Sequence, residues 1–141
     1  MKRWGWIVLA VVLVGCGGGG GRGYTEDTKR SPLTVTATPA EVHRGGMVTI
    51  GVFEKNIYGQ PYLGPQGAVV VVTFPQAWNE QAAGFTVGKD LLPVSCTITV
   101  PTTCPLGDYT VTARLTFDAG IQNGQHVRYD QLGSVTVRVI N

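Results

Sequence analysis

Short runs in which apolar residues alternate with threonine and other polar residues recur along this chain from Leu33 to Ile140. The segment Leu33–Thr38 alternates with a period of two and ends at Pro39, and Met47–Phe53 repeats the pattern after two glycines. A period of two places successive side chains on opposite faces of a β-strand. No long window shows the 3.6-residue apolar period of a helix. The pattern therefore predicts an all-β fold.

Five further segments are rich in Val, Thr and Ile and are bounded by Gly, Pro or Asp. They are 68–74, 85–87, 94–100, 109–117 and 134–140. The segment 39–44 is expected to form at most a turn. About seven short strands within residues 32–141, separated by frequent turn signals and without an internal repeat, predict a single antiparallel β-sandwich domain.

The first 15 residues are typical of an export signal. Lys2 and Arg3 provide a positive start, and Trp4–Val14 is an apolar run. That run is too short for a membrane-spanning helix, which needs about 20 apolar residues. We therefore expect residues 1–15 to act as a signal peptide.

The tetrapeptide Leu13-Val14-Gly15-Cys16 resembles the lipobox of bacterial lipoproteins. The resemblance implies cleavage before Cys16, attachment of a diacylglyceryl group to its thiol, and acylation of the new amino terminus with chains such as palmitate. A structural cysteine that follows an apolar stretch by chance is the alternative. Two or three acyl chains anchor a protein durably, at ~0.8 kcal/mol per buried methylene. Gly17, rather than Asp, follows the cysteine, which resembles lipoproteins delivered to the outer membrane of Gram-negative cells.

Residues 16–31 are expected to form a flexible linker. Gly17–Gly21 has no side chain to bury, and Tyr24–Arg30 is mostly polar, so this stretch cannot build a core. Such a linker lets the domain stand off the lipid headgroups. The alternative is that it only provides the length that the lipid-attachment machinery needs.

Without Lys2 and Arg3 the chain has nine basic and nine acidic residues. A neutral chain lacks the basic surface that nucleic-acid binding requires.

Two segments resemble bacterial immunoglobulin-like domains. Pro39–Ile50 resembles the connection between their first two strands, and Pro105–Ala113 resembles the entry to their penultimate strand. The resemblance implies an immunoglobulin-like sandwich in which Tyr109 forms a tyrosine corner, with a buried ring and a hydroxyl bonded to the backbone. The chain departs from antibody domains because strand 68–74 lacks their core tryptophan, although Trp78 follows closely. The two remaining cysteines are also not placed to join the second and sixth strands.

Those two cysteines, Cys96 and Cys104, form an even pair once Cys16 is assigned to lipid. In an exported, oxidising setting they are predicted to form a disulfide. The bridge would close a loop of about nine residues and stabilise the fold by ~2.5 kcal/mol. Metal binding is the alternative, but the spacing, with no nearby histidine, matches neither a zinc knuckle nor a haem site.

Catalytic and metal-binding patterns are weak. The residue types of a cupredoxin-like copper site are present as His43, Met47, Cys104 and His126. These residues lack the usual clustering near the last strand of a copper site. The alternative is that His43 and His126 are ordinary solvent-exposed histidines. Oxygen ligands for calcium occur as Asp118, Asn123 and Asp130, but Asn123-Gly124 also fits a plain turn. No Gly-x-Ser-x-Gly turn occurs and no catalytic triad can be assembled, so we expect no enzyme activity and no cofactor.

The anchor, the linker and the neutral domain favour a lipid-anchored protein of the bacterial cell envelope. Its domain is expected to act as a non-enzymatic binding or structural module for a protein or glycan, or as an accessory subunit of an envelope complex. A small copper- or calcium-binding envelope protein is the alternative. The candidate contact residues are the loop aromatics Tyr58, Tyr62 and Trp78. Trp78 and Phe85 also fit residues that cap the core, so Tyr62 is the stronger surface candidate.

Overall fold

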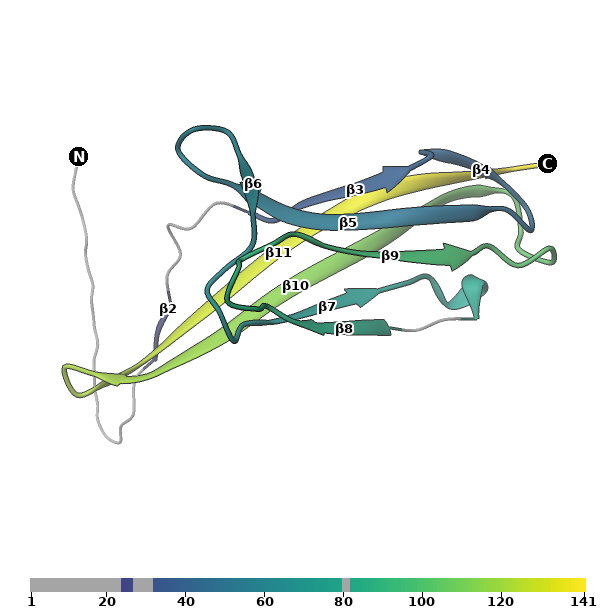
Figure 1. The fold of residues 1–141 in the computed structure, drawn as a ribbon. Coiled ribbons are helices and arrows are strands. Elements are labelled where there is room, and N and C mark those ends of the chain that lie inside the picture. The colour runs from purple at the N-terminus through teal and green to yellow at the C-terminus, as the bar shows by residue number, and fades with distance from the viewer. Residues whose placement is uncertain (1–23, 27–31, 80–81) are drawn as a thin grey trace, which may run out of the picture. The chain divides into compact units, whose positions relative to one another are not determined.

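The computed structural model describes residues 24–26, 32–79 and 82–141 (Figure 1). The expected signal peptide, the lipobox cysteine and most of the linker lie outside the described residues. Within them the structure is built from strands, with one turn of 3-10 helix, η3 (Gln76–Trp78), and no α-helix. The chain divides into two compact units, one of residues 1–29 and 118–129 and a larger one of residues 30–117 and 130–141. Each unit is described separately.

The first sheet of the larger unit is organised around one long strand, β5 (Met47–Lys55). Strand β3 (Thr34–Thr38) pairs with residues 49–53 of β5, and β9 (Val94–Thr99) pairs with residues 47–52. Because both partners use the same stretch of β5, they lie on its two opposite edges. The two-residue strand β6 (Pro61–Tyr62) pairs with Glu54 and Lys55 at the end of β5, which lies between β3 and β6 in the strand order. All of these pairings are antiparallel.

The second sheet of the larger unit has the order β4-β11-β10-β7-β8. Its strands are β4 (Glu41–His43), β7 (Val69–Thr73), β8 (Ala82–Thr86), β10 (Gly107–Gln122) and β11 (Gln125–Ile140), the last two contributing their residues outside 118–129. Strand β7 pairs antiparallel with both β10 and β8. Strand β4 pairs in parallel with residues 138–140 of β11.

The chain crosses between the two sheets at Pro39. Strand β3, before the proline, pairs with β5 of the first sheet, whereas β4, just after it, pairs with β11 of the second (Figure 1). Proline supplies no backbone N–H, so the ladder with β5 stops there and the chain can leave its first partner. One continuous segment therefore belongs to both sheets.

A single hydrophobic core joins the two sheets. In each sheet the buried side chains alternate along the strand, as the period of two in the sequence predicts. The fully buried residues include Val48, Ile50 and Val52 of β5, Val70 and Val72 of β7, Val111 and Leu115 of β10, and Val137 and Val139 of β11. Burial of each such side chain contributes roughly 1.5–3 kcal/mol. The predicted all-β, two-sheet architecture is confirmed.

Each of the seven predicted strands overlaps an observed one, although 85–87 shares only residues 85 and 86 with β8, and the strand count and some lengths differ. Short strands β4 and β6 are additional, and β4 lies where only a turn was expected. A three-residue strand is too short to show a period, so pairing with β11 rather than local pattern defines it. Strands β10 and β11 are each 16 residues long and exceed the predicted segments 109–117 and 134–140. The additional residues are mostly polar and show no alternation of apolar residues, so the sequence pattern did not reveal them.

The smaller unit contains the turn between β10 and β11. Asn123 and Gly124 have φ angles of 52° and 79°, so this dipeptide forms the plain turn that the sequence offered as the alternative to a calcium ligand. Strand β2 (Tyr24–Glu26) pairs in parallel with residues 126–128 of β11. These three residues of the expected linker therefore form a short strand, because β11 supplies backbone partners that no sequence pattern of the linker reveals.

Candidate partner-binding surface

The turn between β5 and β6 is fixed by the side chain of Asn56. Its Oδ1 accepts hydrogen bonds from the backbone N–H of Tyr58 at 2.8 Å and of Gln60 at 3.0 Å. The backbone N–H of Asn56 donates to the Gln60 carbonyl at 2.9 Å, and Gly59 adopts a φ of 79° that favours glycine. An asparagine that bonds backbone groups two and four residues ahead closes a compact Asx-type turn. The turn is therefore well ordered before any partner binds.

Two large side chains project into solvent from this turn. Ile57 is 90% exposed and Tyr58 is 79% exposed. Exposing such side chains gains nothing for the fold, because burial in the core is what makes them stabilising. Presented on a pre-ordered turn, they are instead available for contact at a low cost in conformational entropy.

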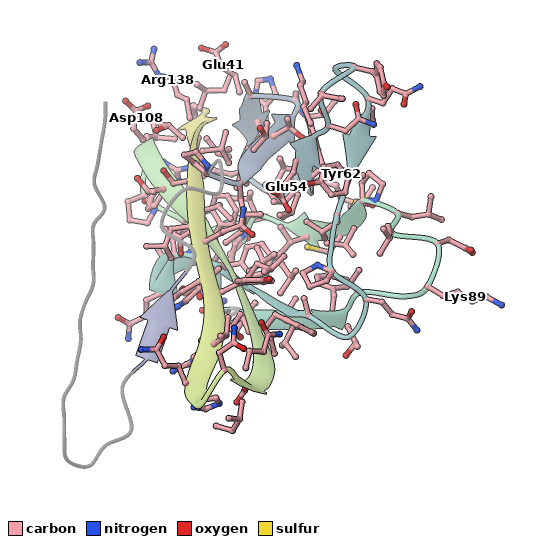
Figure 2. All side chains as sticks on the ribbon, turned by 90° about the vertical axis from the view of Figure 1, so that its left-hand side faces the viewer. Glu41, Glu54, Tyr62, Lys89, Asp108 and Arg138 are labelled. Carbon is pink, nitrogen blue, oxygen red and sulfur yellow. The ribbon has the colours of Figure 1, made fainter. Side chains whose placement is uncertain are left out.

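Tyr62, on β6, is half-buried and its hydroxyl lies 3.5 Å from Oε1 of Glu54 (Figure 2). Glu54 is only 3% exposed and also accepts a hydrogen bond of 2.9 Å from Nε2 of Gln131 on β11. A buried carboxylate must receive such hydrogen bonds to offset its lost hydration. These contacts connect the base of the β5–β6 turn to the opposite sheet.

A second apolar loop lies beside this segment. The backbone N–H of Leu63 donates to the carbonyl of Leu91 at 2.9 Å, which joins the loop between β8 and β9 to the chain after β6. A β-carbon placed on Gly64 would lie 3.6 Å from both the Leu91 side chain and the Tyr62 ring, so these two side chains converge there. Leu92 is exposed next to them, and Lys89 of the same loop extends into solvent (Figure 2).

We define the loop surface as Ile57, Tyr58, Tyr62, Leu91 and Leu92. Four of these side chains are exposed and lie on two loops, whereas Tyr62 is half-buried on β6; a backbone hydrogen bond from Leu63 to Leu91 joins the two segments. Surfaces of this composition are typical of the centres of protein–protein interfaces. Two of the three predicted contact residues, Tyr58 and Tyr62, belong to it.

The third predicted contact residue, Trp78, is a core residue. It is 2% exposed and packs against the rings of Phe74, at a centroid distance of 6.4 Å, and of Tyr109, at 6.0 Å. Its placement as a contact residue is therefore wrong, and the alternative of a core-capping tryptophan is right. The reason lies in η3, which follows Pro75 and returns the chain over the end of the sandwich.

Tyr109 forms the predicted backbone contact. Its hydroxyl donates a hydrogen bond of 2.6 Å to the carbonyl of Pro105, four residues upstream, and the ring is half-buried against Trp78. A hydrogen bond with the neighbouring Cys104 side chain, together with partial burial, raises the pKa of Tyr109 above its ordinary value.

The two cysteines are both free thiols in the structure. Cys104 is buried and its thiol lies 3.4 Å from the carbonyl of Pro105, whereas Cys96 is half-buried on β9. Burial raises the pKa of the Cys96 thiol. The structure does not contain the predicted bridge, which stays a prediction that peptide mapping of unreduced protein tests.

The candidate metal ligands are engaged in other interactions. His43 Nδ1 lies 2.9 Å from the carbonyl of Asn141, and His126 pairs with Asp118 at 2.6 Å. Asp118 also accepts from the backbone N–H of Gly120, and this hydrogen bond, followed by that of His126, lowers its pKa. Asp130 Oδ1 accepts a hydrogen bond of 2.8 Å from Nε of Arg114. Among residues 24–26, 32–79 and 82–141, no three His, Cys, Asp or Glu side chains gather as a metal site would require.

One group of charged side chains lies around Arg138, together with Asp108 and Glu41 (Figure 2). Its Nε donates to Asp108 Oδ1 at 2.9 Å, and its Nη1 lies 3.9 Å from Glu41 Oε2. The hydrogen bond to Asp108 and the charges of both carboxylates raise the pKa of Arg138. Arg138 balances only one of these two carboxylates, so the group retains one negative charge.

Sequence reasoning missed Glu54, Ile57 and the two leucines of the 88–92 loop. A charged residue in an alternating strand, such as Glu54 in β5, signals a buried polar contact only once its partner strand is known. The paired leucines within a Gly- and Pro-flanked loop were the available signal for an exposed apolar loop.

No helix in the described part of the chain is long and apolar enough to cross a membrane. Comparison with protein-family models, with curated proteins and with solved structures finds no match to this chain.

Proposed function

We propose that this chain is a bacterial lipoprotein, anchored in the cell envelope through acylated Cys16, whose folded part is a non-enzymatic immunoglobulin-like binding module. Its partner is a protein or glycan contacted by the loop surface. The lipobox and the Gly-rich segment after it support the anchor. Proximity to an acylated membrane surface also places the module among envelope components.

The strand order supports the immunoglobulin-like assignment. Such sandwiches combine a sheet containing the first, second and fifth strands of the fold with one containing the third, sixth and seventh. Here β3, β5 and β9 form one sheet and β7, β10 and β11 lie in the other, which also holds the fourth strand, β8, beside β7, as in the variable type rather than the constant type of the fold. The hydrogen bond from Tyr109 to Pro105 matches the tyrosine corner at the start of the penultimate strand.

The pre-ordered β5–β6 turn is the observation that favours partner binding most directly. Asn56 fixes a turn whose two most exposed side chains, Ile57 and Tyr58, are both large and apolar. Aliphatic groups at Ile57 and Leu92 fit apolar pockets of a protein better than the polar rings of a sugar, so a protein partner is favoured over a glycan.

Site-specific photocrosslinking in intact cells tests this function. A photoreactive amino acid at position 58 is expected to give a discrete crosslinked species, identified by mass spectrometry, that weakens when Ile57 is also changed to Ala. Met47 is a matched control position, because it is 65% exposed but lies on β5 at the end remote from the turn. Equal crosslinking from positions 47 and 58 would contradict a specific loop surface.

Stability measurements separate contact from folding. Tyr58→Ala should change the free energy of unfolding by less than about 0.5 kcal/mol, because the side chain is solvent-exposed. A large loss of stability together with the loss of crosslinking would assign Tyr58 to the fold instead of to a partner.

A further inference from the structure

Strand β8 is the last strand of its sheet. Its residues pair with β7 from Val69↔Thr86 to Thr73↔Ala82, and no described strand pairs with its other edge. An exposed strand edge presents N–H and C=O groups that can pair with another strand.

The register determines which backbone groups face outward. The N–H of Val87 donates to the Ala68 carbonyl at 2.8 Å, so Val87 faces β7. Hydrogen-bonded positions alternate along an antiparallel ladder, which directs Ala83 and Phe85 toward β7 as well. The backbone groups of Ala82, Gly84 and Thr86 therefore point away from the sheet.

This edge lacks the features that usually prevent strand addition. The sequence Ala-Ala-Gly-Phe-Thr contains no charge and no proline. Gly84, at its centre, has open space around the position of a β-carbon. The neighbouring outward residues on β7, Val69 and Val71, are 43% and 38% exposed, so the face beside the edge is also apolar.

We propose that two copies of this chain associate by antiparallel pairing of their β8 strands about a two-fold axis at Gly84. In that register Gly84 faces Gly84 of the second copy, and Ala82 faces Thr86. Each facing pair can exchange two backbone hydrogen bonds, so all three outward residues are satisfied.

A second copy fits this edge because the strand is complementary to itself. Under two-fold symmetry, a charged residue at the centre of an edge strand would face the same charge on the second copy. Strand β8 has no charged residue, so its pairing involves no such repulsion. The outward backbone groups lie symmetrically about Gly84, and the apolar residues Val69 and Val71 of both copies then extend one continuous face. The contact is small, so the dimer is expected to be weak and dependent on concentration.

Sedimentation of the full chain in a density-matched nonionic detergent measures this association. We expect a reversible monomer–dimer equilibrium whose dimer fraction rises with protein concentration. Hydrogen–deuterium exchange resolved to single amides should show slower exchange at Ala82, Gly84 and Thr86 at high concentration, but unchanged exchange at Ala83 and Phe85. A monomer at every concentration, or a dimer without this alternating protection, would overturn the proposal.

Substitution at the two-fold axis provides the second test. Gly84→Lys places two ammonium groups opposite each other and is expected to weaken dimerisation roughly tenfold. Thr112→Lys is the matched control, because Thr112 is exposed on β10 of the same sheet, away from the edge. Circular dichroism establishes that both variants fold. Equal dimerisation of the two variants would contradict β8 pairing, whereas Tyr58→Ala should leave it unchanged, which keeps this test independent of the proposed function.

Discussion

At the scale of single residues, close approach of backbone segments leaves some positions of this fold without room for a side chain. Gly133 on β11 lies against Leu33, and a β-carbon there would overlap the carbonyl oxygen of Leu33. The same region includes the hydrogen bond of 3.1 Å from the Leu33 N–H to the Leu132 carbonyl. The entry to β3 is therefore packed directly on β11.

Gly133→Ala is predicted to lower the free energy of unfolding by about 2 kcal/mol, because rigid backbone cannot yield to the added methyl group. Gly88→Ala is the control, since a β-carbon at Gly88 contacts nothing within 4 Å. Urea denaturation of both variants measures the difference. Equal stability of the two would show that Leu33 moves away at little cost.

Tyr109 predicts how stability depends on alkaline pH. Its folded pKa is raised, chiefly by the hydrogen bond with Cys104, whereas tyrosine in an unfolded chain titrates near pH 10. The unfolded state therefore loses its proton first, so this contribution is complete below pH 10 and disappears as the pH rises through the folded pKa. Thermal unfolding between pH 8 and 12 should show this loss in the wild type and a smaller one in Tyr109→Phe. At neutral pH the same variant should melt roughly 3–6 °C lower, because the bond to Pro105 is lost.

At the scale of elements, the turn between β5 and β6 allows the effect of loop order on binding to be tested without changing the exposed side chains. Asn56→Ala removes the acceptor for the N–H groups of Tyr58 and Gln60 but leaves Ile57 and Tyr58 in place. We predict weaker crosslinking from position 58, because the turn must then be ordered on binding. Asn56→Asp retains an acceptor oxygen and should restore most of the signal. Identical crosslinking from both variants would show that turn order does not contribute.

The elements that could be predicted are those whose own sequence differs clearly from the loops around it. Strands β3 and β5 alternate apolar and polar residues, and β7 is a continuous run of valines, so local sequence locates all three. In β7 the burial alternates although the sequence does not, and Val69 and Val71 are exposed. Strands β2, β4 and β6 are two or three residues long, and each is defined by its backbone pairing with a longer strand, β11 or β5. Tyr109 was predictable because its motif is local. Trp78 packs on Tyr109 and Glu54 bonds Gln131, both distant in sequence, so the sequence left the position of Trp78 ambiguous and gave no sign of the role of Glu54.

At the scale of the whole molecule, the lipid anchor determines where the protein is found. Cys16→Ser is predicted to move the protein from the membrane fraction to the soluble fraction, because the acyl chains attach to this thiol in the proposed lipoprotein. Cys96→Ser, which removes a thiol outside the lipobox, should remain with membranes. Fractionation followed by intact-mass measurement checks both variants, and an unchanged mass and location for Cys16→Ser would contradict the anchor.

The crossing of one segment from β5 to β11 also determines how the fold responds to tension. Within the larger unit, a pull applied at Leu33 acts first on β3, which is paired along five residues with β5, and then on β4, which is paired with the C-terminal residues of β11. Detaching this segment requires separation from both sheets in succession. In the larger unit, β3 and β4 would therefore act as two mechanical barriers in series when a tether pulls on Leu33 against a bound partner, so loss of β3 would leave β4 still resisting force.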